Sequence, residues 1–215
     1  MNKKKSRNFQ IIRVANKKIP KTDSEEKEEL NFIKKIIGDV PVTFLEFGVY
    51  EGKSIKNASE IFFHTKSRFV GFDSFEGLPE QWGRYHPRGT YDTMGRTPVI
   101  NDDRIFFIKG LFQNTLPSFI SNITKENSEN TNDFKINLTN SVLIINMDAD
   151  LFSSTLYCLT KLDPIIKQGT IIRFDEFLSL EDECIAFYDY IRSYYKDFEI
   201  LAANDDLLHV IIRMK

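Results

Sequence analysis

The chain has little of what marks secreted, membrane or nucleic-acid-binding proteins. It has 2 cysteines, Cys158 and Cys184, both on apolar faces of predicted helices. We expect them to be buried free thiols in a reducing compartment, the cytoplasm. No apolar run approaches the roughly 18–20 residues that span a bilayer. The N-terminus is basic but lacks a following apolar stretch, so we expect no signal peptide there.

Charge of one sign is also lacking, because the formal net charge is only -2. We therefore expect neither nucleic acid nor a membrane among the partners. The length of 215 residues and the aromatic content of 13% suit one folded domain with a substantial core. Residues 1–22 are basic and carry no acid. We interpret them as a mobile N-terminal arm. The alternative is an arm that covers the site or a neighbouring subunit, and the second case is compatible with a homodimer.

Apolar runs alternate with stretches of helical spacing, which is typical of a parallel α/β sheet. A long segment, 74–103, is punctuated by glycine and proline and is either functional or a failure of this assignment. The expected strands are 43–47, 68–72, 104–108, 142–147, 170–174, 199–202 and 208–213, the last two forming a hairpin. Helices are expected from Asp23 or Ser24 to Ile37, from Ser54, from Thr115 with Pro117 in the first turn, from Ser153 or Ser154, and over 181–195.

Nearly every expected strand in the middle of the chain ends in a carboxylate. Ligands of parallel α/β sheets bind beyond the carboxyl ends of the strands. We therefore expect these acids to meet at one edge, where a cofactor and a metal would be held. The acids are Glu46, Asp73, Asp148, Asp150, Asp175 and Glu176.

The loop after the first strand, EFGVYEGKS, indicates the cofactor. Gly48 permits a tight turn and Gly52 a close approach to a ligand, because neither has a Cβ. Glu46 would receive a ligand ammonium, and Asp73, at the end of the next strand, would bind ribose hydroxyls. The dinucleotide pattern G-x-G-x-x-G is absent, and an acid at the first turn repels pyrophosphate, so S-adenosylmethionine is favoured over NAD. Alternatively, Glu46 only ties down the loop and Asp73 caps the turn that follows it.

The acids after the fourth and fifth strands indicate a metal. Carboxylates with no histidine or cysteine beside them suit a hard cation such as Mg²⁺, Mn²⁺ or Ca²⁺. Coordination would lower the pKa of a bound hydroxyl, and Asp150 is our candidate for the base that takes its proton. The alternative is that these acids cap helices.

Five segments resemble the macrocin O-methyltransferase (TylF-like) group of class I S-adenosylmethionine-dependent methyltransferases. They are LEFGVYEGKS, GFDSFEGLPEQW, KGLFQNTLP, MDADLFSST and GTIIRFDEF. The resemblance covers about residues 40–215. It implies a Rossmann-like α/β fold in a single domain, residues 23–215, whose seven-stranded sheet is mostly parallel with an antiparallel last strand and has helices on both faces.

The resemblance also implies roles for individual residues. Asp150 would be the base, and members mostly carry an aspartate pair where this chain has Asp175-Glu176. Magnesium or manganese would be held by Asp148, Asp175 and Glu176. The cofactor would be contacted by Glu46, Gly48, Tyr50, Gly52, Ser54, Asp73, Ser74, Gly110, Leu111, Phe112 and Asp148. Segment 74–103 would be a lid that shapes the acceptor pocket with Trp82, Tyr85, His86 and Tyr91, or else these four form a satellite hydrophobic cluster.

The sequence therefore predicts an S-adenosylmethionine- and Mg²⁺-dependent O-methyltransferase for a small hydroxylated acceptor, such as a sugar or glycoside. The chain lacks an extended substrate domain, so the acceptor need not be an antibiotic sugar. The alternative is a metal-dependent nucleotide-sugar glycosyltransferase that uses the D-x-D at 148–150. A nicotinamide-dependent oxidoreductase and a non-catalytic domain that keeps only the fold are weaker rivals. His64 and His209 are expected to be structural.

Overall fold

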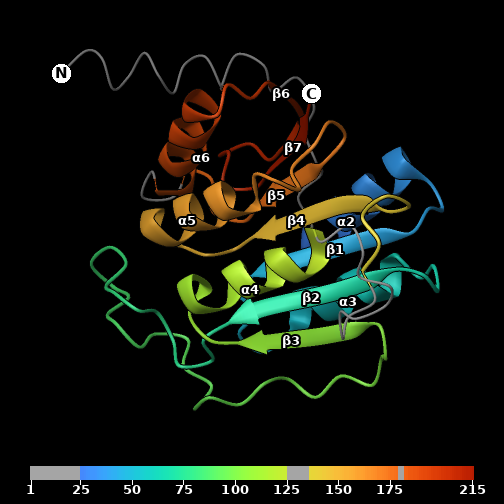
Figure 1. Cartoon of the computed structure of the whole chain (residues 1–215). Coiled ribbons are helices and arrows are strands. Elements are labelled where there is room, and N and C mark those ends of the chain that lie inside the picture. The colour runs from blue at the N-terminus through green and yellow to red at the C-terminus, as the bar shows by residue number, and fades with distance from the viewer. Residues whose placement is uncertain (1–24, 125–135, 179–181) are drawn as a thin grey trace.

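A computed structural model of the chain describes residues 25–124, 136–178 and 182–215. Its centre is one seven-stranded sheet of order β3-β2-β1-β4-β5-β7-β6 (Figure 1). The first five strands run parallel, and β7 lies antiparallel between β5 and β6. The strands are β1 (Val42–Phe47), β2 (Arg68–Asp73), β3 (Ile105–Lys109), β4 (Val142–Met147), β5 (Ile171–Phe174), β6 (Phe198–Ala203) and β7 (Val210–Met214). The predicted fold class is confirmed.

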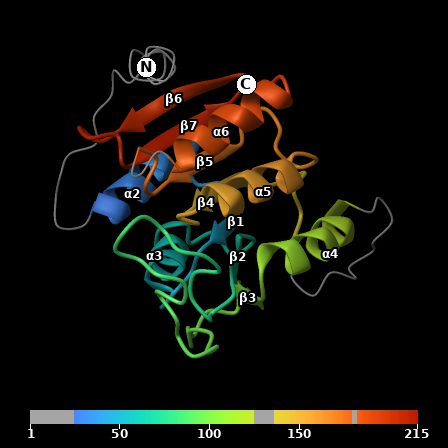
Figure 2. The ribbon, with the colours of Figure 1, turned by 90° about the vertical axis from the view of Figure 1, so that its left-hand side faces the viewer.

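In the described part of the chain, five helices cover the two faces of the sheet. They are α2 (Glu25–Ile37), α3 (Lys53–Ile61), α4 (Phe112–Thr124), α5 (Phe152–Leu162) and α6 (Asp182–Ser193). Helices α2 and α3 lie on one face and α4, α5 and α6 on the other, as the view onto the strand ends shows (Figure 2). Two helical layers around a parallel sheet explain why the central strands are apolar on both sides.

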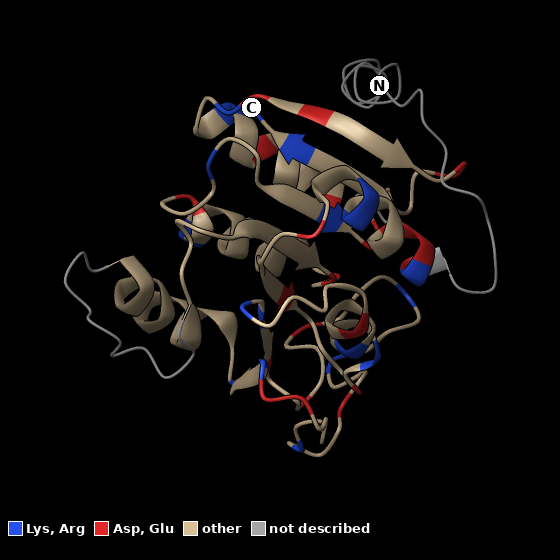
Figure 3. Cartoon of the chain, turned by 90° about the vertical axis from the view of Figure 1, so that its right-hand side faces the viewer, with Lys and Arg blue, Asp and Glu red and all other residues tan. Residues whose placement is uncertain are grey.

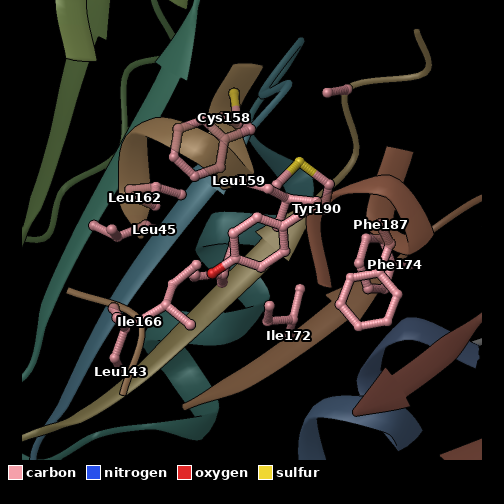
Figure 4. Packing of buried hydrophobic residues seen from close by; sticks show 14 of the residues in the cluster. Leu45, Leu143, Cys158, Leu159, Leu162, Ile166, Ile172, Phe174, Phe187 and Tyr190 are labelled. Carbon is pink, nitrogen blue, oxygen red and sulfur yellow. The ribbon is translucent and has the colours of Figure 1, made fainter. Parts of the chain in front are cut away.

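Alternation along the strands divides the core into two parts. Leu45 and Phe47 of β1 point into the larger cluster with α4, α5 and α6, whereas Val42 and Phe44 point into the smaller cluster with α2 and α3. Leucine, isoleucine and aromatic side chains of the larger cluster interlock around Tyr190 in Figure 4. Burial of such side chains is the main favourable contribution to folding.

Most expected elements are confirmed to within two residues, including the final hairpin, whose turn contains 204–206. Helix α4 is a correction, because it begins at Phe112 and holds Pro117 in its interior rather than in its first turn. Proline cannot donate to the Gln113 carbonyl four residues earlier. The Tyr157 hydroxyl lies 3.4 Å from that oxygen and donates to it instead.

The other differences concern helix ends. Helix α5 is preceded by Leu151, which offers no side-chain cap, so neither Ser153 nor Ser154 is the cap. The expected cap at residue 23 or 24, the arm 1–22 and most of the loop 124–140 lie outside the described residues. Both cysteines are buried thiols that form no disulfide with each other, as predicted. Within the described ranges, no helix has the length and apolarity needed to cross a membrane.

Candidate functional site

A cavity of about 250 Å³ opens beyond the carboxyl ends of β1, β2, β4 and β5. This is the edge at which the parallel strands of such a sheet place a ligand. The structure brings together there all the predicted site residues except Glu46, Gly52 and Ser54. Those that line the cavity are Gly48, Tyr50, Asp73, Ser74, Gly110, Leu111, Phe112, Asp148, Asp150, Asp175 and Glu176.

Gly48 lets the loop after β1 cross the end of β4. Its φ is +88°, and a Cβ on it would lie 1.8 Å from the Asp148 carbonyl oxygen. Gly52 also has a positive φ, but a Cβ there would meet Pro98 of the returning segment 74–103, at 2.8 Å, and not the cavity. Gly52 therefore makes room for Pro98 in this structure.

Asp73 fastens the same loop. One carboxylate oxygen accepts from the backbone N–H groups of Val49 and Tyr50, at 2.8 and 2.9 Å. The other accepts from Phe75 N–H at 2.7 Å. A carboxylate has about four acceptor positions, so about one remains for a ligand. Asp73 thus caps the turn after β2, as the alternative reading held, and also faces the cavity.

Glu46 lies beneath the cavity, fully buried on β1. Its Oε1 accepts from Ser54 Oγ and from Asn146 Nδ2, while its Oε2 has no hydrogen-bond partner among the described residues. Burial raises the pKa of Glu46 to about 8, although the two hydrogen bonds favour the ionised form. In this arrangement Glu46 and Ser54 tie the loop to the sheet, and neither lines the cavity.

A row of polar side chains continues from Glu46 across the sheet. The register places Glu46 beside Asn146 of β4 and Asn146 beside Arg173 of β5. Arg173 is buried, donates to Asn146 Oδ1 at 2.8 Å, and forms ion pairs with Glu29 of α2 and with Asp175. We call Glu46, Asn146, Arg173, Glu29 and His209 the inner polar row.

His209 closes the inner polar row on the far side. Its Nδ1 lies 2.7 Å from Glu29 Oε1. Burial opposes protonation of the ring, but Glu29 outweighs it and raises the pKa of His209. Its expected structural role is confirmed, because it joins the start of β7 to α2. His64, after α3, accepts from Lys66 N–H at 3.1 Å, away from the cavity.

Four acids that follow β4 and β5 in the chain lie at the cavity wall: Asp148, Asp150, Asp175 and Glu176. We call them the edge acids. Burial, followed by repulsion from Asp175 and Asp150, raises the pKa of Asp148 well above its usual value. Burial, Glu176 and Asp175 raise the pKa of Asp150 to about 7. Asp175 differs, because the Arg173 guanidinium outweighs its burial and lowers its pKa.

Left-handed backbone directs three residues at the cavity. Tyr50, Tyr91 and Asp150 have φ values of 49°, 67° and 58°, and all three line the cavity. Residues other than glycine adopt this conformation at a cost, and such positions concentrate at functional sites.

The edge acids have the chemistry of a metal site but not its geometry. Their oxygen donors and unrelieved repulsion suit a hard cation. Among the described residues, however, no three acid, histidine or cysteine side chains converge closely enough to hold one, and Arg173 already pairs with Asp175. The predicted ligands Asp148, Asp175 and Glu176 therefore share a cavity wall without forming a preassembled metal site.

Glu183 is a residue that sequence reasoning missed. It is buried in the first turn of α6. Its carboxylate accepts from the backbone N–H groups of Ala149 and Glu176, at 3.4 and 3.3 Å, and so joins the two loops that carry the edge acids. Burial, followed by Asp175, raises the pKa of Glu183 well above its usual value. Its one signal in the sequence, an acid at a helix start, does not distinguish it from an ordinary cap.

Segment 74–103 contains no helix or strand, and its residues 77–79 line the cavity. Tyr91 lines the cavity and meets Tyr50 edge-on, with 5.6 Å between ring centroids. His86 stacks on Tyr91 and packs against the buried Trp82. Tyr85 is 87% exposed and takes no part. Three of the four residues predicted for the lid therefore form one cluster, and one of them reaches the cavity.

Comparison with known proteins supports the fold independently. No family model matches the sequence, and no curated protein is similar to it. Among solved structures, the calicheamicin methyltransferase CalS11 is similar over 99% of this chain and 93% of its own, with a TM-score of 0.64 at 17% identity. The O-methyltransferase NovP is similar over 87% and 78%, with a TM-score of 0.60 at 19% identity.

A third structure, cmcI bound to Mg and S-adenosylmethionine, is similar over 88% of this chain and 71% of its own, with a TM-score of 0.52 at 16% identity. At these identities the likeness shows the fold alone. The chain has the class I methyltransferase fold, whereas its place in the TylF-like group stays a prediction.

Proposed function

We propose that this protein is an S-adenosylmethionine-dependent O-methyltransferase that acts on a hydroxyl of a small acceptor. One observation carries the proposal. In a fold shared with O-methyltransferases, a single cavity beyond β1, β2, β4 and β5 gathers nearly all of the residues predicted for the cofactor and the reaction.

The cavity walls fit this cofactor. S-adenosylmethionine carries a sulfonium and an ammonium group, and the described residues that line the cavity include acids but no lysine, arginine or histidine. The loop at Gly48, held by Asp73, leaves room for the methionine part. Asp73 retains about one acceptor position, enough for one ribose hydroxyl. We propose that Gly110, Leu111 and Phe112 pack against the adenine, because they line the same cavity.

When bound, S-adenosylmethionine supplies an electrophilic methyl group. The acceptor oxygen forms the new bond to the methyl carbon as the carbon–sulfur bond breaks. The electron pair of the broken bond stays on sulfur, which leaves S-adenosylhomocysteine. Asp150 faces the cavity and takes the hydroxyl proton, which typically contributes 10²–10⁴-fold to such a rate. Tyr91, from segment 74–103, and Tyr50, from the loop after β1, meet edge-on at the cavity wall.

A divalent cation remains part of the proposal. Asp148, Asp175 and Glu176 would be its ligands, as the resemblance implies, and the ion would supply Lewis-acid chemistry. The glycosyltransferase alternative lacks support, because the described cavity wall offers no cationic side chain for a diphosphate. A sugar or glycoside acceptor is consistent with the TDP-rhamnose substrate named for CalS11.

The test is calorimetric titration of S-adenosylmethionine into wild type, Asp73→Asn and Asp150→Asn, each with and without Mg²⁺. We expect micromolar binding to wild type. Asp73→Asn should weaken it by about ten-fold or more, because charged acceptors of two loop N–H groups are lost. Asp150→Asn is the matched control and should bind the cofactor nearly as well. A thermal shift with Mg²⁺ alone tests the metal without an activity assay. Absence of cofactor binding under every condition would refute the proposal.

A further inference from the structure

A second cavity lies beside the cavity proposed for the cofactor. Its volume is about 310 Å³, and it is formed by the loop after β1 and by residues 92–98 of segment 74–103. Tyr50 lines both cavities, so the two adjoin at this residue. No other residue of the second cavity has a role in the proposed function.

The cofactor cavity is small for a cofactor and an acceptor together. Its volume is about 250 Å³, whereas pockets for drug-sized molecules, a class that includes S-adenosylmethionine, have roughly 300–1,000 Å³. The bound cofactor would therefore fill most of this cavity and leave space for little more than the reacting hydroxyl. The rest of the acceptor needs space outside it, and the second cavity adjoins it at Tyr50.

The wall of the second cavity carries charges of both signs, unlike that of the first. Arg96 lines it together with Glu51 and Asp92. Arg96 Nε donates to the Thr93 carbonyl oxygen at 3.3 Å, and among the described residues no carboxylate forms an ion pair with its guanidinium. Asp92 Oδ1 accepts from the Met94 N–H at 2.6 Å, which leaves Oδ2 for a ligand.

This mixture of groups favours a polyhydroxylated ligand. A sugar hydroxyl both donates and accepts hydrogen bonds, so it can pair with a guanidinium as well as with a carboxylate. A phosphate would meet Glu51 and Asp92, and an ammonium group would meet Arg96, so each would be repelled by part of the same wall.

Apolar surface is also available in the second cavity. Met94 is 70% exposed and Tyr50 is 43% exposed, and both line it. Both have left-handed backbone, with φ values of 57° and 49°, which costs free energy in residues other than glycine. Apolar and aromatic side chains beside a few polar groups are the usual composition of a small-molecule site. A ring with apolar C–H faces and hydroxyls at its edge fits both parts of this wall.

We propose that the acceptor is a glycoside with at least two sugar rings. One ring presents its hydroxyl in the cofactor cavity, and the next ring lies in the second cavity against Tyr50 and Met94, with hydroxyls bonded to Arg96 and Asp92. This inference rests on the proposed function and defines its substrate class. A single free sugar is then a poor acceptor.

The test compares matched pairs of probes on the full chain saturated with S-adenosylhomocysteine. Each pair holds the methyl glycoside of one sugar and that of a disaccharide ending in the same sugar, for glucose, galactose, mannose and rhamnose. Octyl glucoside carries an apolar extension in place of the second ring. Calorimetry and ligand-observed NMR measure binding. We expect the disaccharide of at least one pair to bind about ten-fold more tightly than its monosaccharide, and octyl glucoside to show a smaller advantage.

Two variants locate the second ring. Thr97 is exposed and lines the second cavity but not the first, so Thr97→Trp should fill the second cavity and remove the advantage of the disaccharide. Arg96→Ala should reduce the advantage several-fold, because donors to the second ring are lost. Arg88→Ala, at an exposed arginine of the same segment that lines neither cavity, is the matched control and should leave it unchanged. All three variants should bind S-adenosylmethionine as the wild type does, which verifies that they are folded.

Three results would overturn the proposal. The first is equal binding of monosaccharide and disaccharide in every pair, which would confine the acceptor to the cofactor cavity. The second is an advantage of the disaccharide that persists undiminished in Thr97→Trp or in Arg96→Ala, which would place the second ring elsewhere. The third is an equal advantage for octyl glucoside, which would show that the extension is apolar.

The two proposals fail in different ways. Titration of S-adenosylmethionine reports on the methyltransferase proposal without any acceptor. If the cofactor binds and no disaccharide has an advantage, only the acceptor class is wrong. If a disaccharide binds through the second cavity and the cofactor does not bind, the chain recognises glycosides but the methyltransferase proposal fails.

Discussion

The inner polar row and the edge acids are close in the chain and opposite in character. Asn146 and Arg173 precede Asp148 and Asp175 by two residues each. In the inner row, the buried charge of Arg173 lies against Glu29 and Asp175, and Asn146 links it to Glu46. Among the edge acids, only Asp175 has a described ion-pair partner, and Asp148 and Asp150 have raised pKa values.

This difference separates folding from function. Buried charges that serve only the fold are normally paired, because an unpaired buried charge is costly. The edge acids keep unrelieved repulsion at the cavity wall, which is the pattern of groups positioned for a ligand. Asp175 joins the two regions, since Arg173 holds it from the inner side while it faces the cavity.

The largest effect should follow from breaking the inner polar row. Arg173→Met removes the partner of Glu29 and Asp175 and leaves buried Glu29 with only His209 among its described ion-pair partners. We expect a loss of about 3–5 kcal/mol in the free energy of unfolding, measured by urea denaturation. The double variant Arg173→Met/Glu29→Gln should recover part of this loss, because it removes the stranded charge. Equal stability of Arg173→Met and wild type would show that the inner polar row does not stabilise the fold, and would contradict its contrast with the edge acids.

A second, smaller effect concerns Glu46, at one end of the inner polar row, because burial raises its pKa. The pKa of Glu46 is about 8 in the folded protein and about 4.5 when exposed. Between these pH values the folded state keeps a proton that the unfolded chain has released, so stability should fall as pH rises through this window. Glu46→Gln mimics the protonated acid and should remove this fall, which amounts to on the order of 3 kcal/mol.

The measurement is urea denaturation of wild type and Glu46→Gln between pH 5 and pH 8.5, without cofactor. Glu51→Gln, at an exposed acid of the same loop, should keep the slope of the wild type. If Glu46→Gln and wild type lose stability in parallel, Glu46 is ionised throughout and needs a partner that the described residues do not provide.

The comparison also explains what the sequence could predict. Strand positions and the acids at their ends were predictable, because apolar runs mark strands and parallel strands end at one edge. Gly48 was predictable for a similar reason, since its turn is local. Arg173 and Glu29 are 144 residues apart, and nothing local in either segment announces their ion pair. The role of Asn146 likewise depends on which strands flank β4, and that of Glu183 on which loops α6 approaches.

Charge composition alone would not have located the site. Basic and acidic residues are interspersed on the helices and loops of the side in Figure 3, and the net charge is only -2. The acidic character of the cavity comes from the arrangement of five lining carboxylates without a described lysine, arginine or histidine in the wall. Tyr50, which joins this wall through its left-handed backbone, was predicted only by the family resemblance, because composition and spacing do not separate it from a surface tyrosine.

The smallest expected change is an increase in the free energy of unfolding. It tests the contrast between the edge acids and the inner polar row most sharply. Asp150→Asn removes one charge from the edge acids, and asparagine tolerates the left-handed backbone found there. We expect the free energy of unfolding at pH 8 to rise by about 0.5–2 kcal/mol, because repulsion with Glu176 and Asp175 is lost. Methyl transfer should fall by about 10²–10⁴-fold, because the proton acceptor is gone. Urea denaturation and release of S-adenosylhomocysteine measure the two effects on the same preparation. A variant that is both less stable and fully active would show that Asp150 serves the fold, and would move it from the edge acids to the same class as the inner polar row.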